Sequence, residues 1–305
     1  MGIHEFARKV GTALQAELGS GYQVEYREVR KNNGVLLCGL LVTAQGRNMV
    51  PTIYINDFWE AYEAGMTLWE AVRRILHIYL EETPRQDVDM DFFKSFEQVK
   101  GRICYRLVGR DGNMELLRHM PYVEYLDMAI CFFYAFQSEV LGEGSIQVLH
   151  AHMEFWETDR EELLGLARMN TPRLFPWMCA PLGDILLGAL GTDCGFMVPQ
   201  EYEGQEDGLQ LPMKVLSNRQ QLNGAACMLY PGVLDQIAAQ MGCGFYILPS
   251  SVHEVILLPD QGEEDPGSLK SMVVQVNRTQ VPREDILTDS LYCFDPAQKA
   301  MKKIL

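Results

Sequence analysis

The chain has 305 residues and a formal net charge of −15, with 48% hydrophobic and 22% charged side chains. This balance is typical of a folded globular protein and excludes an intrinsically disordered chain. The acidic charge disfavours binding to DNA, RNA or an anionic membrane, because phosphate groups are bound by clustered Lys and Arg. At about 100–200 residues per domain, the length predicts two domains.

The sequence predicts a cytoplasmic protein that has no membrane contact and needs no cofactor. Residues 1–9 carry an early acid and no apolar run, unlike a secretory signal. The longest apolar stretch, residues 128–136, is too short to span a bilayer. The eight cysteines form no C-x-x-C pair, which favours reduced, buried thiols over a zinc ribbon or a redox site. The glycines form neither of the common phosphate-binding loops.

Charge is distributed unevenly along the chain. Residues 1–120 carry 15 basic and 16 acidic side chains, whereas residues 121–305 carry 11 basic and 25 acidic ones. We therefore expect two modules, an N-terminal one over 1–115 and an acidic C-terminal one over 116–305. A strongly acidic module can also imitate DNA and occupy a DNA-binding protein, which is a remote alternative to a merely solubilising charge.

Hydrophobic periodicity predicts the elements of the first module. Apolar residues at helical spacing indicate a helix over 3–18. Asn33-Gly34 predicts a hairpin between strands at 22–30 and 35–42, because both turn residues tolerate positive φ. A third strand is expected at 53–55. Thr67 and Glu70 form a capping box that opens a helix to about residue 80, and a strand follows at 102–108.

The second module mixes adjacent strands with helices. We expect a helix from the capping box at 158–161 to about 170, halted by Pro172, and loops at 171–182 and 195–212. Further helices are expected at 231–241 and 265–276. Strands are expected at 126–136, 145–149, 213–217, 225–230, 245–248 and 255–258. Runs of neighbouring strands predict an α+β fold, with two modules of mostly antiparallel strands packed with helices.

Several sequence strings carry a resemblance to known families. They are KNNGV at 31–35, PTIYIN at 51–56, NGAA at 223–226, LYPGVL at 229–234 and YILPSSVHEV at 246–255. Over nearly its full length the chain resembles a domain-of-unknown-function family carried by gut Firmicutes. The later half, about 126–260, is similar to a second uncharacterised family that is widespread in bacilli. The resemblance implies a cytoplasmic bacterial protein and supplies no activity or catalytic residue.

His150, His152 and Glu154 form the first candidate site, a metal centre. On a strand, positions i, i+2 and i+4 share a face, so two imidazoles and a carboxylate could bind one cation. If the segment is helical instead, side chains two positions apart diverge and an ordinary surface His pair is the expected outcome.

Ser251, His253 and Glu254 form the second candidate site, because a hydroxyl, a base and an acid are the parts of a nucleophilic centre. A tight turn stabilised by the Ser hydroxyl is the simpler alternative. The segment is also a candidate binding surface, formed by Pro249, Ser250, Ser251 and His253, because it is a polar tip between two apolar strands.

The sequence favours a non-catalytic binding or regulatory protein, with a protein partner expected. A metal-assisted or Ser-dependent hydrolase, built on one of the two candidate sites, is the alternative. Convergence of His150, His152 and an acid on one point would favour the enzyme, and divergence would exclude the metal centre.

Overall fold

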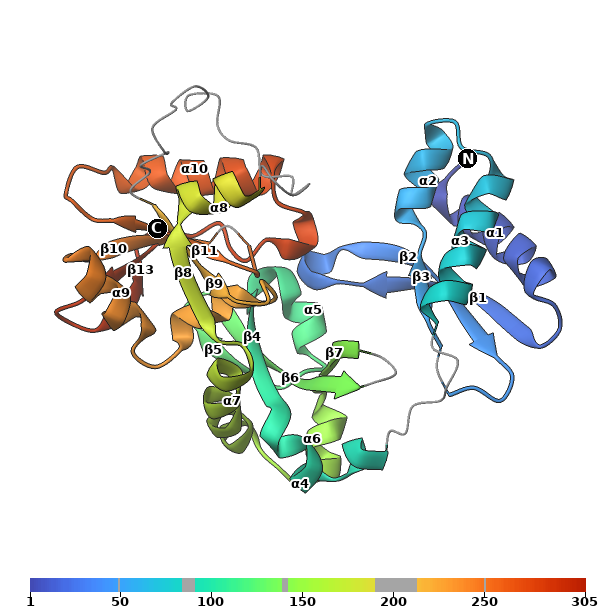
Figure 1. The fold of residues 1–305 in the computed structure, drawn as a ribbon, viewed down its shortest axis with the longest axis horizontal. Helices are drawn as coiled ribbons and strands as arrows, with labels where there is room; N and C mark the ends of the chain where they lie inside the picture. Colours follow the sequence, from blue (N-terminus) through green and yellow to red (C-terminus); the bar gives the residue numbers. More distant parts are fainter. Residues whose placement is uncertain (49, 84–90, 139–141, 190–212, 250) are drawn as a thin grey trace. The chain divides into compact units, whose positions relative to one another are not determined.

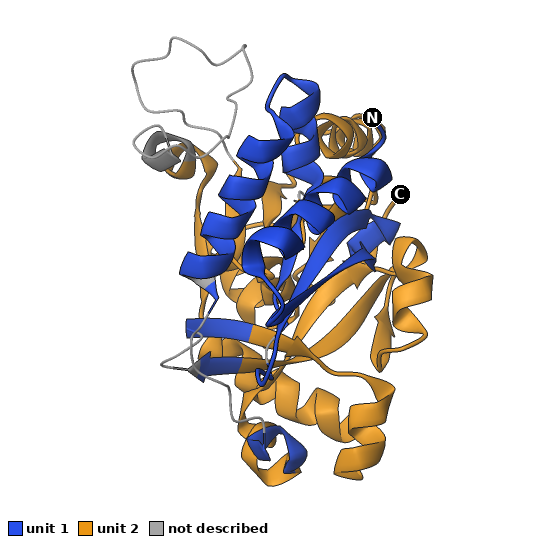
Figure 2. Ribbon diagram, turned by 90° about the vertical axis from the view of Figure 1, so that its right-hand side faces the viewer, with its two compact units in different colours: residues 1–95, 136–144 blue, residues 96–135, 145–305 orange. Residues whose placement is uncertain are grey.

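The computed structural model describes residues 1–48, 50–83, 91–138, 142–189, 213–249 and 251–305. The chain forms two compact units, one of residues 1–95 and 136–144 and one of residues 96–135 and 145–305 (Figure 2). Their strand pairings are antiparallel and are mixed with helices, which confirms the predicted α+β fold. The predicted division at residue 115 stays a prediction.

The first unit is built on a three-stranded sheet with the order β1-β2-β3 (Figure 1). Asn33 and Gly34 have φ of +56° and +68°, so the Asn-Gly hairpin is confirmed, within a five-residue connection that pairs Arg30 with Leu36. The elements of this unit are α1 (Ile3–Leu18), β1 (Tyr22–Arg30), η1 (Asn32–Gly34), β2 (Leu36–Ala44), β3 (Thr52–Tyr54), α2 (Asn56–Glu63), α3 (Leu68–Glu82) and η2 (Asp91–Lys94).

The core of the first unit lies between α1, α3 and the sheet. Phe6 and Val10 of α1 are buried with Leu40 of β2 and Ile75 of α3. The predicted capping box at the start of α3 is confirmed. The Glu70 amide donates to the Thr67 hydroxyl at 3.2 Å, and the Thr67 amide donates to the Glu70 carboxylate at 2.8 Å. These bonds satisfy two amides that a helix end leaves without partners.

The second unit contains two sheets. In the smaller sheet β6 lies between β4 and β5 and also pairs with β7, and the ends of β6 and β7 that fall within 136–144 belong to the first unit. The larger sheet has the order β13-β12-β10-β11-β9-β8. The strands are β4 (Ile103–Gly109), β5 (Tyr122–Tyr125), β6 (Met128–Ser138), β7 (Gly142–Gln147), β8 (Trp177–Pro181), β9 (Lys214–Asn218), β10 (Phe245–Leu248), β11 (Val255–Pro259), β12 (Tyr292–Asp295) and β13 (Ala300–Lys303).

Helices cover both sheets of the second unit. Helix α7 packs on β4, and α10 packs on β10 through Leu269 and Val273. The helices are α4 (Phe96–Val99), η3 (Lys100–Arg102), η4 (Asp111–Asn113), α5 (Met114–Leu117), α6 (His150–Trp156), α7 (Arg160–Leu174), α8 (Leu182–Ala189), η6 (Gly224–Leu229), α9 (Val233–Met241), α10 (Pro266–Thr279) and η7 (Arg283–Asp285). None of the helices in the described ranges has both the length and the apolar character to cross a membrane.

The strand predicted at 225–230 is wrong, because this segment is the 3₁₀ helix η6. Its apolar run is buried all round, and such a run cannot be assigned to strand or helix by periodicity. The local cause is a tight bend before it. Asn223 has φ of +54°, and a Cβ at Gly224 would overlap the Ser217 hydroxyl and the His253 carbonyl.

The helix predicted at 158–170 ends later in the structure than expected. Helix α7 starts after Asp159, whose carboxylate accepts the Glu162 amide at 2.9 Å, and it continues through Pro172 to Leu174. Its last turn is held to β4, because the Tyr105 amide donates to the Thr171 hydroxyl at 3.0 Å. The loop expected at 171–182 is therefore wrong, since it contains this turn and strand β8. The loop expected at 195–212 lies outside the described residues.

Candidate functional site

The predicted nucleophile, Ser251, is part of a closed turn between β10 and β11. Its side chain donates to a Glu254 carboxylate oxygen at 2.7 Å and accepts the His253 amide at 2.9 Å. The residue is only 5% exposed, and Pro249 is buried as well. Ser250, the remaining predicted binding residue, lies outside the described residues. The turn therefore matches the simpler alternative of a Ser-stabilised bend.

The predicted base, His253, is held by groups other than Ser251. Its Nδ1 accepts the Asn223 amide at 3.2 Å, so Nε2 carries the ring proton, and Nε2 lies 3.4 Å from the Asp285 carboxylate. The serine is thus paired with a glutamate and the histidine with an aspartate. A nucleophile needs its base within hydrogen-bond reach, and this pairing gives Ser251 no imidazole base.

The predicted metal ligands lie on a helix and not on a strand. His150, His152 and Glu154 belong to α6, where residues two positions apart project in different directions. His152 instead closes the start of the helix, since its Nδ1 accepts the Leu149 amide at 3.1 Å, and burial lowers its pKa. Across the described part of the chain, no three His, Cys, Asp or Glu side chains are placed to hold a metal ion.

Cys104, Cys131 and Cys227 are buried in the core, as the sequence predicts for the cysteines in general. Burial raises the pKa of the Cys104, Cys131 and Cys227 thiols to about 12. Because the thiolate is the reactive form, these three side chains are not nucleophiles near neutral pH.

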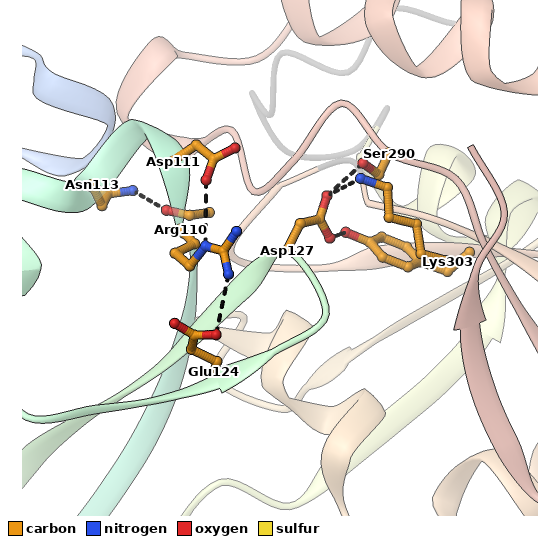
Figure 3. A network of polar contacts seen from close by, with 9 residues as sticks. Arg110, Asp111, Asn113, Glu124, Asp127, Ser290 and Lys303 are labelled. Atoms are coloured by element: carbon orange, nitrogen blue, oxygen red, sulfur yellow. Dashed lines mark hydrogen bonds and ion pairs between the residues drawn. The ribbon is translucent and has the colours of Figure 1, made fainter.

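Asp127 is the centre of a polar network that joins the two sheets of the second unit (Figure 3). It occupies the turn between β5 and β6, and its carboxylate accepts the Ser290 and Tyr292 hydroxyls, both at 2.6 Å, and the Lys303 ammonium at 3.0 Å. Partial burial acts to raise the pKa of this carboxyl, but the three donors outweigh it and lower the pKa. The network holds the β12–β13 hairpin against the turn between β5 and β6. Because three donors bind the Asp127 carboxylate, it is not free to act as a general base.

A cavity of about 230 Å³ lies elsewhere in the second unit and is the strongest candidate site. Five segments line it, and each brings side chains from a different part of the sequence. Its lining residues are Tyr105, Tyr125, Ile130, Leu164, Arg168, Met228, Leu229, Tyr230, Gly232, Leu234, Asp235, Phe294, Lys299 and Met301. The lining combines aromatic and aliphatic side chains with charged ones, and small-molecule sites commonly combine an apolar, aromatic lining with a few polar groups.

Tyr105 is the unusual member of this lining. The side chain is 2% exposed, and its hydroxyl has no hydrogen-bond partner among the described residues. Its neighbour Tyr230, with ring centroids 6.2 Å apart, instead donates its hydroxyl to the Phe175 carbonyl at 3.0 Å. A buried hydroxyl without a partner is costly, and this oxygen is closed to the cavity, so Tyr105 contributes its ring and not its hydroxyl to the lining.

Three charged residues also line the cavity, namely Arg168 of α7, Asp235 of α9 and Lys299 of the β12–β13 turn. Within the described part of the chain none of the three forms a salt bridge. Asp235 lies in the first turn of α9, where the helix dipole stabilises a carboxylate. Arg168 and Lys299 are both exposed to solvent.

The sequence predicted none of these cavity residues. Tyr105 belongs to a buried strand, Arg168 to an amphipathic helix and Lys299 to a turn, and each is ordinary in its local pattern. Only the packing of β4, the β5–β6 hairpin, α7, η6 with α9, and the β12–β13 hairpin brings them together.

Comparison with known proteins supplies a family but no activity. No curated protein matches the chain, and no solved structure matches it. The sequence profile of one family of unknown function, DUF5688, matches residues 3–296. The chain therefore belongs to the DUF5688 family, and the match extends over both compact units.

Proposed function

We propose that the chain is a non-catalytic binding protein, and that the cavity of the second unit takes up a small ligand. The observation that carries this proposal is the cavity of about 230 Å³, which is lined by five segments of the chain and by the aromatic side chains Tyr105, Tyr125, Tyr230 and Phe294. Ligand sites are commonly concave and lined by aromatic side chains, as this cavity is.

The size of the cavity supports a small metabolite. Its volume of about 230 Å³ is below the roughly 300–1,000 Å³ of sites for drug-sized ligands. The pairing of Ser251 with Glu254 and of His253 with Asp285 supports a non-catalytic role over the hydrolase, because the serine hydroxyl is not bonded to the imidazole that the predicted nucleophilic centre needs.

A fragment screen by ligand-observed NMR tests the proposal. The library should contain neutral, cationic and anionic compounds in equal shares, and hits should be repeated on Leu164→Trp, which fills the cavity from α7. Leu166→Trp is the matched control, since Leu166 is half-buried on the same helix but outside the lining. We expect hits that Leu164→Trp removes and Leu166→Trp retains. Hits that both variants retain, or no hits, would contradict the proposal.

We also propose a cytoplasmic location and an origin in gut Firmicutes, with the later half of the chain related to the second bacillus family. The free, mostly buried cysteines support a reducing compartment. Cell fractionation of the source organism tests the location, and recovery outside the cytoplasmic fraction would contradict it.

A further inference from the structure

We infer that two copies of the chain pair through β1, edge to edge and antiparallel, with Tyr26 beside the two-fold axis. This surface lies in the first unit and is independent of the ligand cavity in the second. Strand β1 has nine residues and stands at the end of its sheet, so one of its edges has no neighbouring strand among the described residues. An open strand edge is a template on which a further strand can pair.

The even-numbered residues of β1 direct their backbone groups to this open edge. The Lys31 amide donates to the Val35 carbonyl at 2.7 Å, so the odd-numbered positions bond to β2 and the even-numbered ones point away from it. The outward groups include the Val24 carbonyl and the amides and carbonyls of Tyr26 and Glu28. None of these groups has a hydrogen-bond partner among the described residues.

Gln15 of α1 limits the open edge to the later part of the strand. Its side-chain amide donates to the Tyr22 carbonyl and accepts the Val24 amide, both at 2.9 Å, so it occupies the first outward positions as a neighbouring strand would. The free groups are therefore centred on Tyr26. Pairing about this residue forms four hydrogen bonds and leaves Gln15 in place. Two join the Tyr26 residues, and two run from the Glu28 amides to the Val24 carbonyls of the other copy.

Charge selects this register. Glu25 and Arg27 are exposed on the face of β1 that points away from the core, and they lie 3.4 Å apart within one chain. When the two Tyr26 residues are opposite each other, Glu25 stands opposite Arg27 of the second copy, and the two-fold axis forms that pair twice. A shift by two residues places Glu25 opposite Glu25 or Arg27 opposite Arg27, and like charges directly opposite are destabilising. A shift by one residue no longer matches the outward backbone groups.

The other face of β1 accepts the same register. Val24 and Tyr26 pack against the core of the first unit. Glu28, an acid on this face, lies 3.5 Å from His4 and would stand opposite Val24 of the second copy, not opposite another acid. Charges at such positions oppose indiscriminate edge pairing, and this register satisfies that restriction.

Charge reversal tests the pairing by analytical ultracentrifugation of the full chain at about 1–100 µM. We expect a reversible dimer. Glu25→Arg and Arg27→Glu should each weaken it at least about tenfold, because each places two pairs of like charge across the axis. The double variant should restore the dimer, since it reverses both pairs. Glu60→Arg is the matched control, because it changes the net charge equally at an exposed acid of α2, and it should leave the dimer unchanged.

An equimolar mixture of the two single variants is the sharpest test. Each variant repels its own copies, but Glu25→Arg paired with Arg27→Glu forms attractive pairs at both positions. The mixture should therefore dimerise at concentrations where neither variant does alone, which no role of the two residues within one chain can produce. A monomer at the highest concentration, a dimer that neither reversal weakens, or a mixture that stays monomeric would overturn the inference. None of these outcomes bears on the ligand cavity.

Discussion

Replacing Asp127 with Asn is expected to destabilise the second unit by about 2–4 kcal/mol at pH 7. The carboxylate is 19% exposed and accepts two hydroxyl hydrogen bonds of 2.6 Å. Hydrogen bonds to a charged group contribute about 1.5–3 kcal/mol each, and Asn keeps part of that as a neutral acceptor. Lys303 is 42% exposed, so its ion pair adds about 0.2–1 kcal/mol.

The stability lost in Asp127→Asn is expected to depend on pH, and the lowered pKa of Asp127 determines in which direction. Because the pKa of Asp127 is lowered from 3.8 in the folded chain, the carboxylate contributes its full stability above that value. This contribution is lost as the pH falls through the pKa that Asp127 has in the folded chain. The unmodified chain and Asp127→Asn should therefore become equally stable in acid.

Urea unfolding followed by circular dichroism at pH 7 and in acid measures both effects. Hydrogen exchange on peptides from the β12–β13 hairpin locates the loss. Lys302→Gln is the control, because Lys302 lies 3.9 Å from Asp295 and is half-exposed. A loss below about 0.5 kcal/mol at pH 7, or a loss of the same size in acid, would refute the role assigned to the network.

Three further substitutions or measurements address other parts of the fold. Gly224→Ala should lower the free energy of unfolding in urea by about 1–3 kcal/mol, because the new Cβ would overlap the His253 carbonyl. Gly165→Ala is its control, since Gly165 lies in open space on α7, and it should be neutral or stabilising by up to about 1 kcal/mol. Thr67→Ala should lower the unfolding free energy by about 1 kcal/mol through loss of the capping box, and an unchanged midpoint would contradict that reason. Cys104, Cys131 and Cys227 should resist a thiol reagent at pH 8 until the chain unfolds, as read by peptide mass spectrometry, and labelling in the folded chain would show that they are accessible.

Local sequence signals predicted much of the fold. The Asn33-Gly34 turn, the Thr67 capping box and the amphipathic pattern of residues 3–18 each depend on neighbours within a few positions, and all three are confirmed. The wrong predictions occur where residues distant in the sequence determine the local structure. Thr171 holds the end of α7 to β4, and the Gly224 bend forms against Ser217 and His253.

The candidate sites were harder to predict, for the same reason. Ser251, His253 and Glu254 do lie in one turn, but Asn223 and Asp285 decide what the histidine contacts, and these come from other segments. The cavity could not be predicted at all. Tyr105 and Arg168 are unremarkable in their own elements, and their missing partners are visible only once the second unit is folded.

The Asp127 network also bears on how fast the second unit folds and unfolds. Its three bonds join residues 163, 165 and 176 positions apart, so they close after the local turns and hairpins have formed. Bonds that form after the folding transition state affect mainly the unfolding rate. Losing the Asp127 carboxylate should therefore leave the refolding rate nearly unchanged and accelerate unfolding, which makes this single side chain a determinant of the lifetime of the folded state.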